Sequence, residues 1–318
     1  MTDNKEARKT RVRWSSKALR RVRRVAGRPI RRALRSPRCA LIEANYLLAQ
    51  YRLSRSLRPT CTTAVFIHLY YVETWDLFAG KLGNLQGIHY DLFVTLPACN
   101  RRFAEEVRAG FPDAHISVVP NHGRGTLPFI KVARVLSKHR YEVVLKLHCK
   151  KPTSFEEGRS FLQVVVDRLL PDSPQLMREV IDKLSTSSTA ILGPSEVYLP
   201  LTVSLSPNRD GIEVLTRKLV GRAVARQVLD NPARYGFFAG TAFWARLQAI
   251  RPLLRFSSFD FELESGRRDG TMAHVLERMF SLLPQLQGGQ LLEVVDGAIK
   301  PRPSGSSAVP WWLTTSGQ

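Results

Sequence analysis

Four residues that follow a short apolar run are the most chemically informative part of this sequence. Residues 141–147 predict a buried strand, and His148, Cys149, Lys150 and Lys151 come directly after them. Open α/β sheets bind ligands outside the carboxyl ends of their strands, so an imidazole and two ammonium groups at this point predict a phosphate site. A strand followed by a solvated basic turn is the alternative, and these residues alone leave it open.

Two further strand ends carry groups of the same kind. Residues 120–128 place Asn121 and Arg124 between a strand and a helix, where backbone N–H groups and a guanidinium approach phosphate or sugar oxygens. A plain glycine turn is the alternative. His68, near the end of the strand expected at residues 63–70, would lie at the same sheet edge, either stacked on a nucleobase or hydrogen-bonded in the core.

The positive charge of this chain is concentrated near its N-terminus. Its 318 residues carry a net charge of +21, and residues 1–60 hold 18 Lys and Arg against 3 Asp and Glu. A hydrophobic fraction of 44% allows a substantial core in the remainder. We therefore expect a basic, partly helical arm at 1–60, an α/β domain at 61–300 and a Pro- and Ser-rich tail at 301–318.

The basic arm has three interpretations. Its arginines alternate with Trp14 and aliphatic residues, and residues 39–53 have the pattern of a packed or amphipathic helix. This composition suits an anionic membrane surface, which we expect residues 1–58 to contact. Nucleic acid, bound through its phosphates, is a less favoured partner, and a solvated basic tail is the third interpretation.

The cysteines and the hydropathy pattern bear on the cellular compartment of the protein. Cys39, Cys61, Cys99 and Cys149 form no CxxC pair, so neither a zinc site nor a disulfide framework is expected, and a reducing cytoplasm fits. No run of about 18 apolar residues occurs, and the N-terminus lacks the apolar core of a secretory signal. The sequence thus predicts a protein that neither spans a membrane nor is exported.

After residue 60, short apolar runs alternate with helical patterns, which is typical of α/β folds. Four strands within about 90 residues favour a Rossmann-like mixed sheet flanked by helices. Strands are expected at residues 63–70, 90–96, 116–119, 141–147, 189–192 and 237–245, and helices at 73–82, 101–110, 127–139, 161–170, 175–185, 217–229 and 269–282.

Four parts of the chain, in the same order, resemble the rhamnan synthesis protein F family of bacterial rhamnose-containing polysaccharide pathways. They are AVFIHLYYVETWDLF with YDLFVTLP, then VVPNHGRGTLPF, then VLKLHCKK, and finally FFAGTAFWAR with DGTMAHVLERMF. The resemblance covers roughly residues 62–285 and implies a glycosyltransferase-like protein.

The order of parts is also similar to that of nucleotide-sugar-dependent glycosyltransferases of the GT-A type. Those enzymes hold a divalent metal against the nucleotide diphosphate with an Asp-x-Asp element at a strand end, where this chain has His148-Cys149-Lys150. The resemblance then implies no metal and no cofactor, because Mg²⁺ prefers oxygen ligands. Lys146, His148, Lys150 and Lys151 would neutralise the donor's diphosphate directly.

The same resemblance implies a catalytic base and an acceptor side. Asp269 and Glu264 are the candidate carboxylates for accepting the proton of the acceptor hydroxyl, and Asp269 is equally suited to be the N-cap of the helix that follows. Gly240, Thr241 and Trp244 resemble an acceptor-side strand, although a buried tryptophan is usually a core residue.

One position departs from the family pattern. Relatives usually carry an aspartate after the Gly-Arg pair, and this chain has Gly125 there, which leaves open an altered donor or a weakened enzyme. The resemblance implies transfer of rhamnose or a related deoxyhexose from a nucleotide sugar to a lipid-linked glycan, on the cytoplasmic face of a bacterial plasma membrane. The alternatives are a non-catalytic scaffold in a polysaccharide assembly complex and nucleic-acid binding through the arm.

Overall fold

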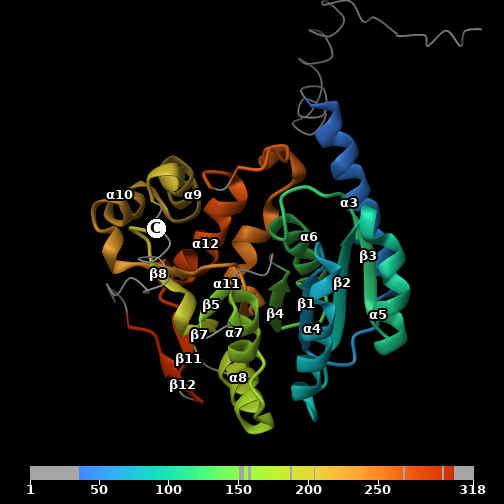
Figure 1. Cartoon of the computed structure of the whole chain (residues 1–318). Helices are drawn as coiled ribbons and strands as arrows, with labels where there is room; N and C mark the ends of the chain where they lie inside the picture. Colours follow the sequence, from blue (N-terminus) through green and yellow to red (C-terminus); the bar gives the residue numbers. More distant parts are fainter. Residues whose placement is uncertain are drawn as a thin grey trace, which may run out of the picture.

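Eight strands form the central mixed sheet in the computed structural model, which describes residues 36–303 apart from 150–153, 157–158, 187, 204, 268 and 296. Their order across the sheet is β12-β11-β7-β10-β4-β1-β2-β3 (Figure 1). The strands are β1 (Thr63–His68), β2 (Asp91–Pro97), β3 (His115–Val119), β4 (Val143–His148), β7 (Thr189–Pro194), β10 (Phe243–Arg246), β11 (Gln290–Val295) and β12 (Ala298–Pro301). The predicted α/β fold with a mixed sheet is confirmed.

The chain reverses its direction of travel across the sheet between β1 and β4. β1, β2 and β3 are successive parallel neighbours, after which β4 returns to pair in parallel with the other side of β1. β10 then enters antiparallel between β4 and β7, and β11 pairs in parallel with β7. Such a reversal opens a crevice beyond the carboxyl ends of the two strands that flank it.

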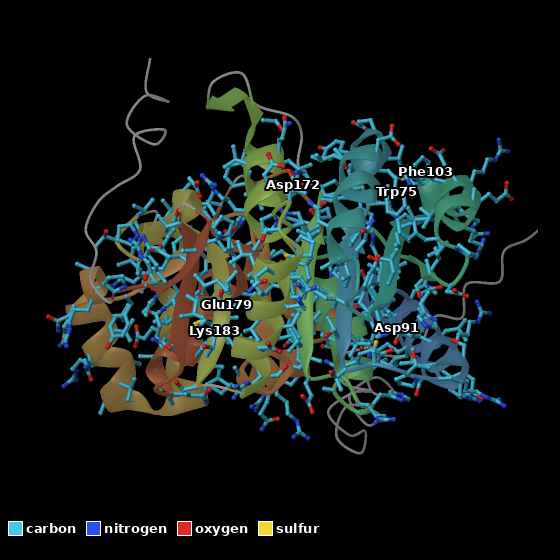
Figure 2. All side chains as sticks on the ribbon, turned by 90° about the horizontal axis from the view of Figure 1, so that it is seen from below. Trp75, Asp91, Phe103, Asp172, Glu179 and Lys183 are labelled. Atoms are coloured by element: carbon cyan, nitrogen blue, oxygen red, sulfur yellow. The ribbon has the colours of Figure 1, made fainter. Side chains whose placement is uncertain are left out.

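Alternating side chains build a separate core on each face of the sheet. In β1, Ala64 and Phe66 join one buried cluster while Val65 and Ile67 join the other. Trp75, Phe103 and Asp172 lie on the side of the second cluster (Figure 2). The first cluster is covered by α3 (Pro37–Ser56), α6 (Thr126–Leu136), α9 (Arg209–Val220), α10 (Arg222–Asp230), α11 (Leu247–Ile250) and α12 (Met272–Leu286), and the second by α4 (Trp75–Leu82), α5 (Ala104–Gly110), α7 (Phe161–Leu169) and α8 (Pro174–Thr186).

Two expected elements are divided where the backbone is left-handed. The strand expected at 237–245 is β9 (Gly236–Phe238) and β10, which belong to different sheets and are separated by Gly240 and Thr241 at φ +80° and +53°. β9 pairs instead with β8 (Tyr198–Pro200). The helix expected at 217–229 is the end of α9 and then α10, separated by Gly221 at φ +105°.

Several short or late strands were not predicted. β11 and β12 complete one edge of the sheet through pairing with β7 and with each other. A small ribbon of β5 (Ser154–Glu156) and β6 (Arg159–Ser160) precedes α7. No helix within the described ranges combines the length and apolar character needed to cross a bilayer.

The second half of the expected basic arm is part of the folded body. α3 begins after Ser36, whose hydroxyl accepts a hydrogen bond from the Cys39 N–H at 3.4 Å. Tyr46 is fully buried, and its hydroxyl donates to the carbonyl oxygens of Pro120 (2.9 Å) and His122 (3.2 Å). Residues 37–56 thus pack with the domain expected to begin at 61, whereas residues 1–35 and the tail from 304 lie outside the described residues.

We expect Tyr46→Phe to lower the free energy of unfolding by about 1–2 kcal/mol, because it leaves buried carbonyl oxygens without their donor. Tyr51→Phe, an exposed hydroxyl on the same helix, is the matched control and should change stability by less than about 0.5 kcal/mol. Urea denaturation of both variants measures the difference. Equal effects would show that the Tyr46 hydroxyl does not anchor α3.

Candidate functional site

The carboxyl ends of β1 and β4 lie side by side at the point where the chain reverses. His68 and His148 are register partners there, and the Cys149 N–H donates to the His68 carbonyl oxygen at 3.2 Å. The His148 side chain is half-buried and adjoins Gly125, where an added Cβ would lie 3.1 Å from the His148 Cβ. The loop before α6 therefore borders the crevice directly, and any side chain at position 125 would press on His148.

Two successive backbone N–H groups at the start of α6 converge on one carboxylate oxygen. Glu264 Oε1 accepts from the N–H of Gly123 at 3.0 Å and of Arg124 at 3.3 Å. Both donors have left-handed backbone, φ +71° and +53°, and a Cβ on Gly123 would lie 2.5 Å from the Leu127 Cβ, so this position requires glycine. Paired N–H groups beside a helix N-terminus form an anion-binding concavity, and here Glu264 supplies the anion.

The Arg124 side chain joins α6 to the start of α12. Its Nη1 lies 3.0 Å from His274 Nε2, and its Nη2 donates to the Arg267 carbonyl oxygen. The other ring nitrogen of His274, Nδ1, faces the Thr271 N–H at 3.3 Å and the Thr271 hydroxyl at 2.8 Å. Burial, and then the charge of Arg124, lower the pKa of His274.

Asp269 lies just before α12 in a fixed set of donors. Asn208 Nδ2 donates to Oδ1 at 2.9 Å, Arg278 Nη2 lies 3.4 Å from Oδ2, and His274 Nδ1 lies 3.7 Å from Oδ1. The N-cap of α12 is Thr271. The capping role considered for Asp269 is therefore wrong, and its carboxylate keeps 28% of its side-chain surface accessible for chemistry.

A second carboxylate holds the left-handed turn between β9 and β10. Glu277 Oε1, from α12, accepts from the Gly240 N–H at 2.7 Å and lies 3.4 Å from the Thr241 hydroxyl. Arg124 and Thr241 are the non-glycine residues with positive φ in the described chain, and both belong to turns bound by carboxylates. Strained backbone of this kind is commonly found at functional sites.

Three sequence-predicted site residues lie in the core. Lys146 is fully buried, and its ammonium donates to the Thr241 carbonyl oxygen at 2.5 Å beside the rings of Phe129 and Phe243. His68 is buried with Nδ1 2.9 Å from Thr95 Oγ1. In this arrangement neither side chain reaches a ligand, because helices cover both faces of the sheet and bury β1 and β4.

Trp244 is also a core residue. It is fully buried, and its Nε1–H donates to the Leu169 carbonyl oxygen at 2.8 Å, so the expected stacking on a sugar is excluded by this packing. The neighbouring Gly240 and Thr241 stay at the carboxyl edge through their contacts with Glu277.

The remaining predicted site residues are partly at the edge and partly outside the described chain. Arg124, Glu264, Asp269 and His148 come together around the starts of α6 and α12, and Asn121 is exposed in the same loop. Lys150 and Lys151 fall outside the described residues, so their roles stay predictions.

Several polar residues of this site were not predicted. His274 and Arg278 follow Asp269 on the first turns of α12. The signal available in the sequence was helical spacing, because residues three to four apart share one helix face. His274 and Arg278 are four residues apart, and His274 and Glu277 are three residues apart.

The cavity at this site is small. Gly123, Arg124 and the loop of residues 261–265 enclose about 10 Å³, which is room for about one water. Cavities of about 590 and 400 Å³ lie at the opposite edge of the sheet, around Arg246 and Arg251. The linings of these two larger cavities lack the set of acids and bases that converges at the starts of α6 and α12.

Comparison with known proteins agrees with the resemblance in the sequence. A family model described as rhamnan synthesis protein F matches residues 31–288. Two curated proteins called WxcX, described as uncharacterized, are 35% and 34% identical over 185 residues, and both come from strains of Xanthomonas campestris pv. campestris. Each alignment covers 57% of this chain, and the chain spans about a quarter of the length of these relatives (25%).

Lys146 should give the protein a measurable pH dependence. Burial lowers the Lys146 pKa from 10.5 to about 7, while Glu277 opposes the shift. Between pH 7 and 10 the unfolded chain binds more protons at Lys146 than the folded chain does. The free energy of unfolding therefore rises with pH over this range, and the contribution of Lys146 becomes constant below pH 7. In urea denaturation, the free energy of unfolding of the wild type should rise by about 2 kcal/mol relative to that of Lys146→Met between pH 7 and 9.

The exposed Lys138→Met is the matched control for this measurement and should show no such gain. A difference between wild type and Lys146→Met that stays constant over this range would mean that the buried ammonium keeps its ordinary pKa.

Proposed function

Because this chain belongs to the rhamnan synthesis protein F family, we propose that it is a glycosyltransferase of polysaccharide biosynthesis. The donor is a nucleotide sugar that carries rhamnose or a related deoxyhexose, and the acceptor is a lipid-linked glycan. The sugar and the acceptor rest on the family, and the reaction class rests on the family together with the site.

The observation that carries the proposal is the meeting of two helix N-termini beyond the reversal of the sheet. The N–H groups of Gly123 and Arg124, the Arg124 guanidinium and the start of α12 all converge there. Two positive helix ends and a guanidinium suit a diphosphate. Glu264 holds the N–H groups while the site is empty, and a donor phosphate replaces it when the loop of residues 261–267 moves outward.

Outward movement of this loop would also make the site less negative, which favours the binding of an anion. Glu262 and Glu264 both belong to this loop and bind the starts of α12 and α6. Their departure removes two negative charges and exposes the N–H groups of Gly123 and Arg124, so the opened site repels an anion less. The small volume of the closed cavity follows from the same contacts.

Asp269 is placed to accept a proton in the transfer step. The acceptor oxygen forms a bond to the anomeric carbon while the bond from that carbon to the diphosphate oxygen breaks, and the electron pair leaves with the nucleoside diphosphate. Asp269 takes the proton of the acceptor hydroxyl, and Arg278 and Asn208 hold its carboxylate in position. The charge that develops on the diphosphate is stabilised at Arg124 and the α6 N–H groups.

A non-catalytic scaffold is the second candidate, and the burial of Lys146, His68 and Trp244 favours it. Three of the residues that were expected to contact the ligands are buried in the core. Such a protein keeps the fold and the closed loop but neither hydrolyses nor transfers a donor sugar.

Purified full-length protein should bind nucleoside diphosphates and hydrolyse or transfer deoxyhexose from a nucleotide sugar, as measured by calorimetry and product release. Arg124→Gln should weaken binding about 10- to 100-fold, because a charged hydrogen-bond donor is lost. Asp269→Asn should leave binding nearly unchanged and lower turnover about 10²- to 10⁴-fold. Arg226→Gln and Asp210→Asn, exposed on α10 and α9, are the matched controls.

Activity indifferent to both site variants would contradict these roles, and binding without any turnover would favour the scaffold. The same assays with EDTA test metal independence, which stays a prediction: a requirement for a divalent ion would contradict direct neutralisation of the diphosphate by His148 and the lysines that follow β4.

Glu264→Gln separates the two candidate bases. If Glu264 only occupies the N–H groups of Gly123 and Arg124, the variant should bind a nucleoside diphosphate about fivefold more tightly and keep its turnover. If Glu264 is the base, turnover should fall by orders of magnitude with unchanged binding. The exposed Glu213→Gln on α9 is the control for the loss of one negative charge.

A further inference from the structure

The helix α3 carries a second apolar face that no other part of the described chain covers. Leu41, Leu47, Leu48 and Tyr51 leave 66%, 52%, 46% and 58% of their surface exposed. At about 100° per residue they fall within an arc of about 120°, on the side of the helix opposite Tyr46. We call these four residues the outer face of α3. A helix with apolar side chains on two sides needs a second apolar environment.

The charges on α3 that border this face are positive. Arg38, Arg52 and Arg55 are exposed, and Arg55 Nη1 donates to the Tyr51 hydroxyl at 3.0 Å. The acidic residue of the helix, Glu43, is turned inward to the Lys131 ammonium and the Ser258 N–H. Residues 1–35, which precede the helix, contain 14 Lys and Arg against 2 Asp and Glu. The sequence around the outer face therefore suits a negatively charged partner.

A basic hollow lies directly beside the outer face. It encloses about 590 Å³ between α3 and the edge strand β3, and Leu48, Arg52 and Arg101 contribute to its walls. β3 pairs with β2 on one side only, so this border of the sheet is not covered by another strand of the described chain. An apolar strip next to a cationic hollow matches the boundary between acyl chains and anionic headgroups.

The outer face runs along the β3 side of the sheet, and its first residue, Leu41, precedes the point where α3 meets the loop of the candidate site. Tyr46, halfway along α3, contacts the carbonyl oxygens of the loop before α6, so the earlier turns extend beyond the carboxyl ends of the strands. In Figure 1 this part of α3 stands out from the body past β3. A surface that receives the outer face is thereby brought close to the carboxyl edge of the sheet.

We infer that the outer face of α3 docks on an anionic lipid bilayer, with its apolar side chains at the acyl boundary and Arg38, Arg52 and Arg55 among the headgroups. A second copy of the chain fits less well. A helix of 20 residues about 30 Å long and 10 Å wide offers about 300 Å², against about 800 Å² per partner in a specific interface. The basic residues 1–35 are repelled by the arginines that border the face.

Sedimentation of the full-length protein with vesicles tests this inference without any donor, so its outcome is separate from that of the proposed transfer. Vesicles of equal parts phosphatidylglycerol and phosphatidylcholine should bind the protein, and pure phosphatidylcholine should bind it far less. Replacing both Leu41 and Leu48 by serine should weaken binding about tenfold. Val214→Ser, an exposed apolar residue on α9, is the matched control and should bind like the wild type.

Salt concentration distinguishes the electrostatic contact of the arginines from the apolar contact of the leucines. In about 1 M NaCl the Debye length is about 3 Å, so the binding that remains depends on apolar insertion and should be lost in the leucine variant. At low salt, Arg52→Gln with Arg55→Gln should weaken binding about fivefold per cation, whereas Arg222→Gln with Arg226→Gln on α10 should not. Unchanged circular dichroism and melting midpoints confirm that all variants are folded.

Three results would overturn the inference. The leucine variant binding vesicles like the wild type at both salt concentrations would assign membrane contact to residues outside α3. A wild-type dimer in analytical ultracentrifugation that the leucine variant converts to a monomer would make the outer face a contact between two copies. Loss of binding to duplex DNA in the arginine variant, with vesicle binding intact, would assign the basic border to nucleic acid.

Discussion

Parallel pairing of β1 with β2 on one side and β4 on the other determines where ligand-binding groups can meet in this protein. The pairing brings the ends of β1 and β4 together and directs the loops that follow β3 and β4 to the same edge. The loop after β3 starts α6, and α12 is joined to it through Arg124 and His274. Each group of the candidate site therefore depends on the position of β1 between its two neighbours.

Carboxylates from one part of the chain hold the strained turns at that edge. Glu264 binds the left-handed turn before α6, and Glu277 binds the one between β9 and β10. Each carboxylate satisfies backbone N–H groups that would otherwise need water or a ligand. The Glu264 side chain is exposed and the Glu277 side chain is half-buried, so the Glu264 contact is the easier to exchange for an external anion.

The order of strands and helices was largely readable from apolar periodicity. Strands β1 to β4 and helices α4 to α8 were expected within a few residues of their bounds. Errors arose where one residue changed the path of the chain: Gly240 with Thr241, and Gly221, each turn the backbone into the left-handed region. Period alone does not reveal such turns, because the apolar pattern continues across them.

The sequence by itself determined the α/β class, the excess of positive charge before residue 60, and the presence of Arg124, Glu264 and Asp269 in segments near strand or helix ends. Only the tertiary structure decided which of the predicted side chains face outward. Lys146 and His68 are buried beneath the helices that cover the sheet, and α12 supplies His274 and Arg278 from more than 100 residues further along the chain. The physical reason is that local pattern encodes element type, whereas the partners of a polar group depend on packing between elements distant in sequence.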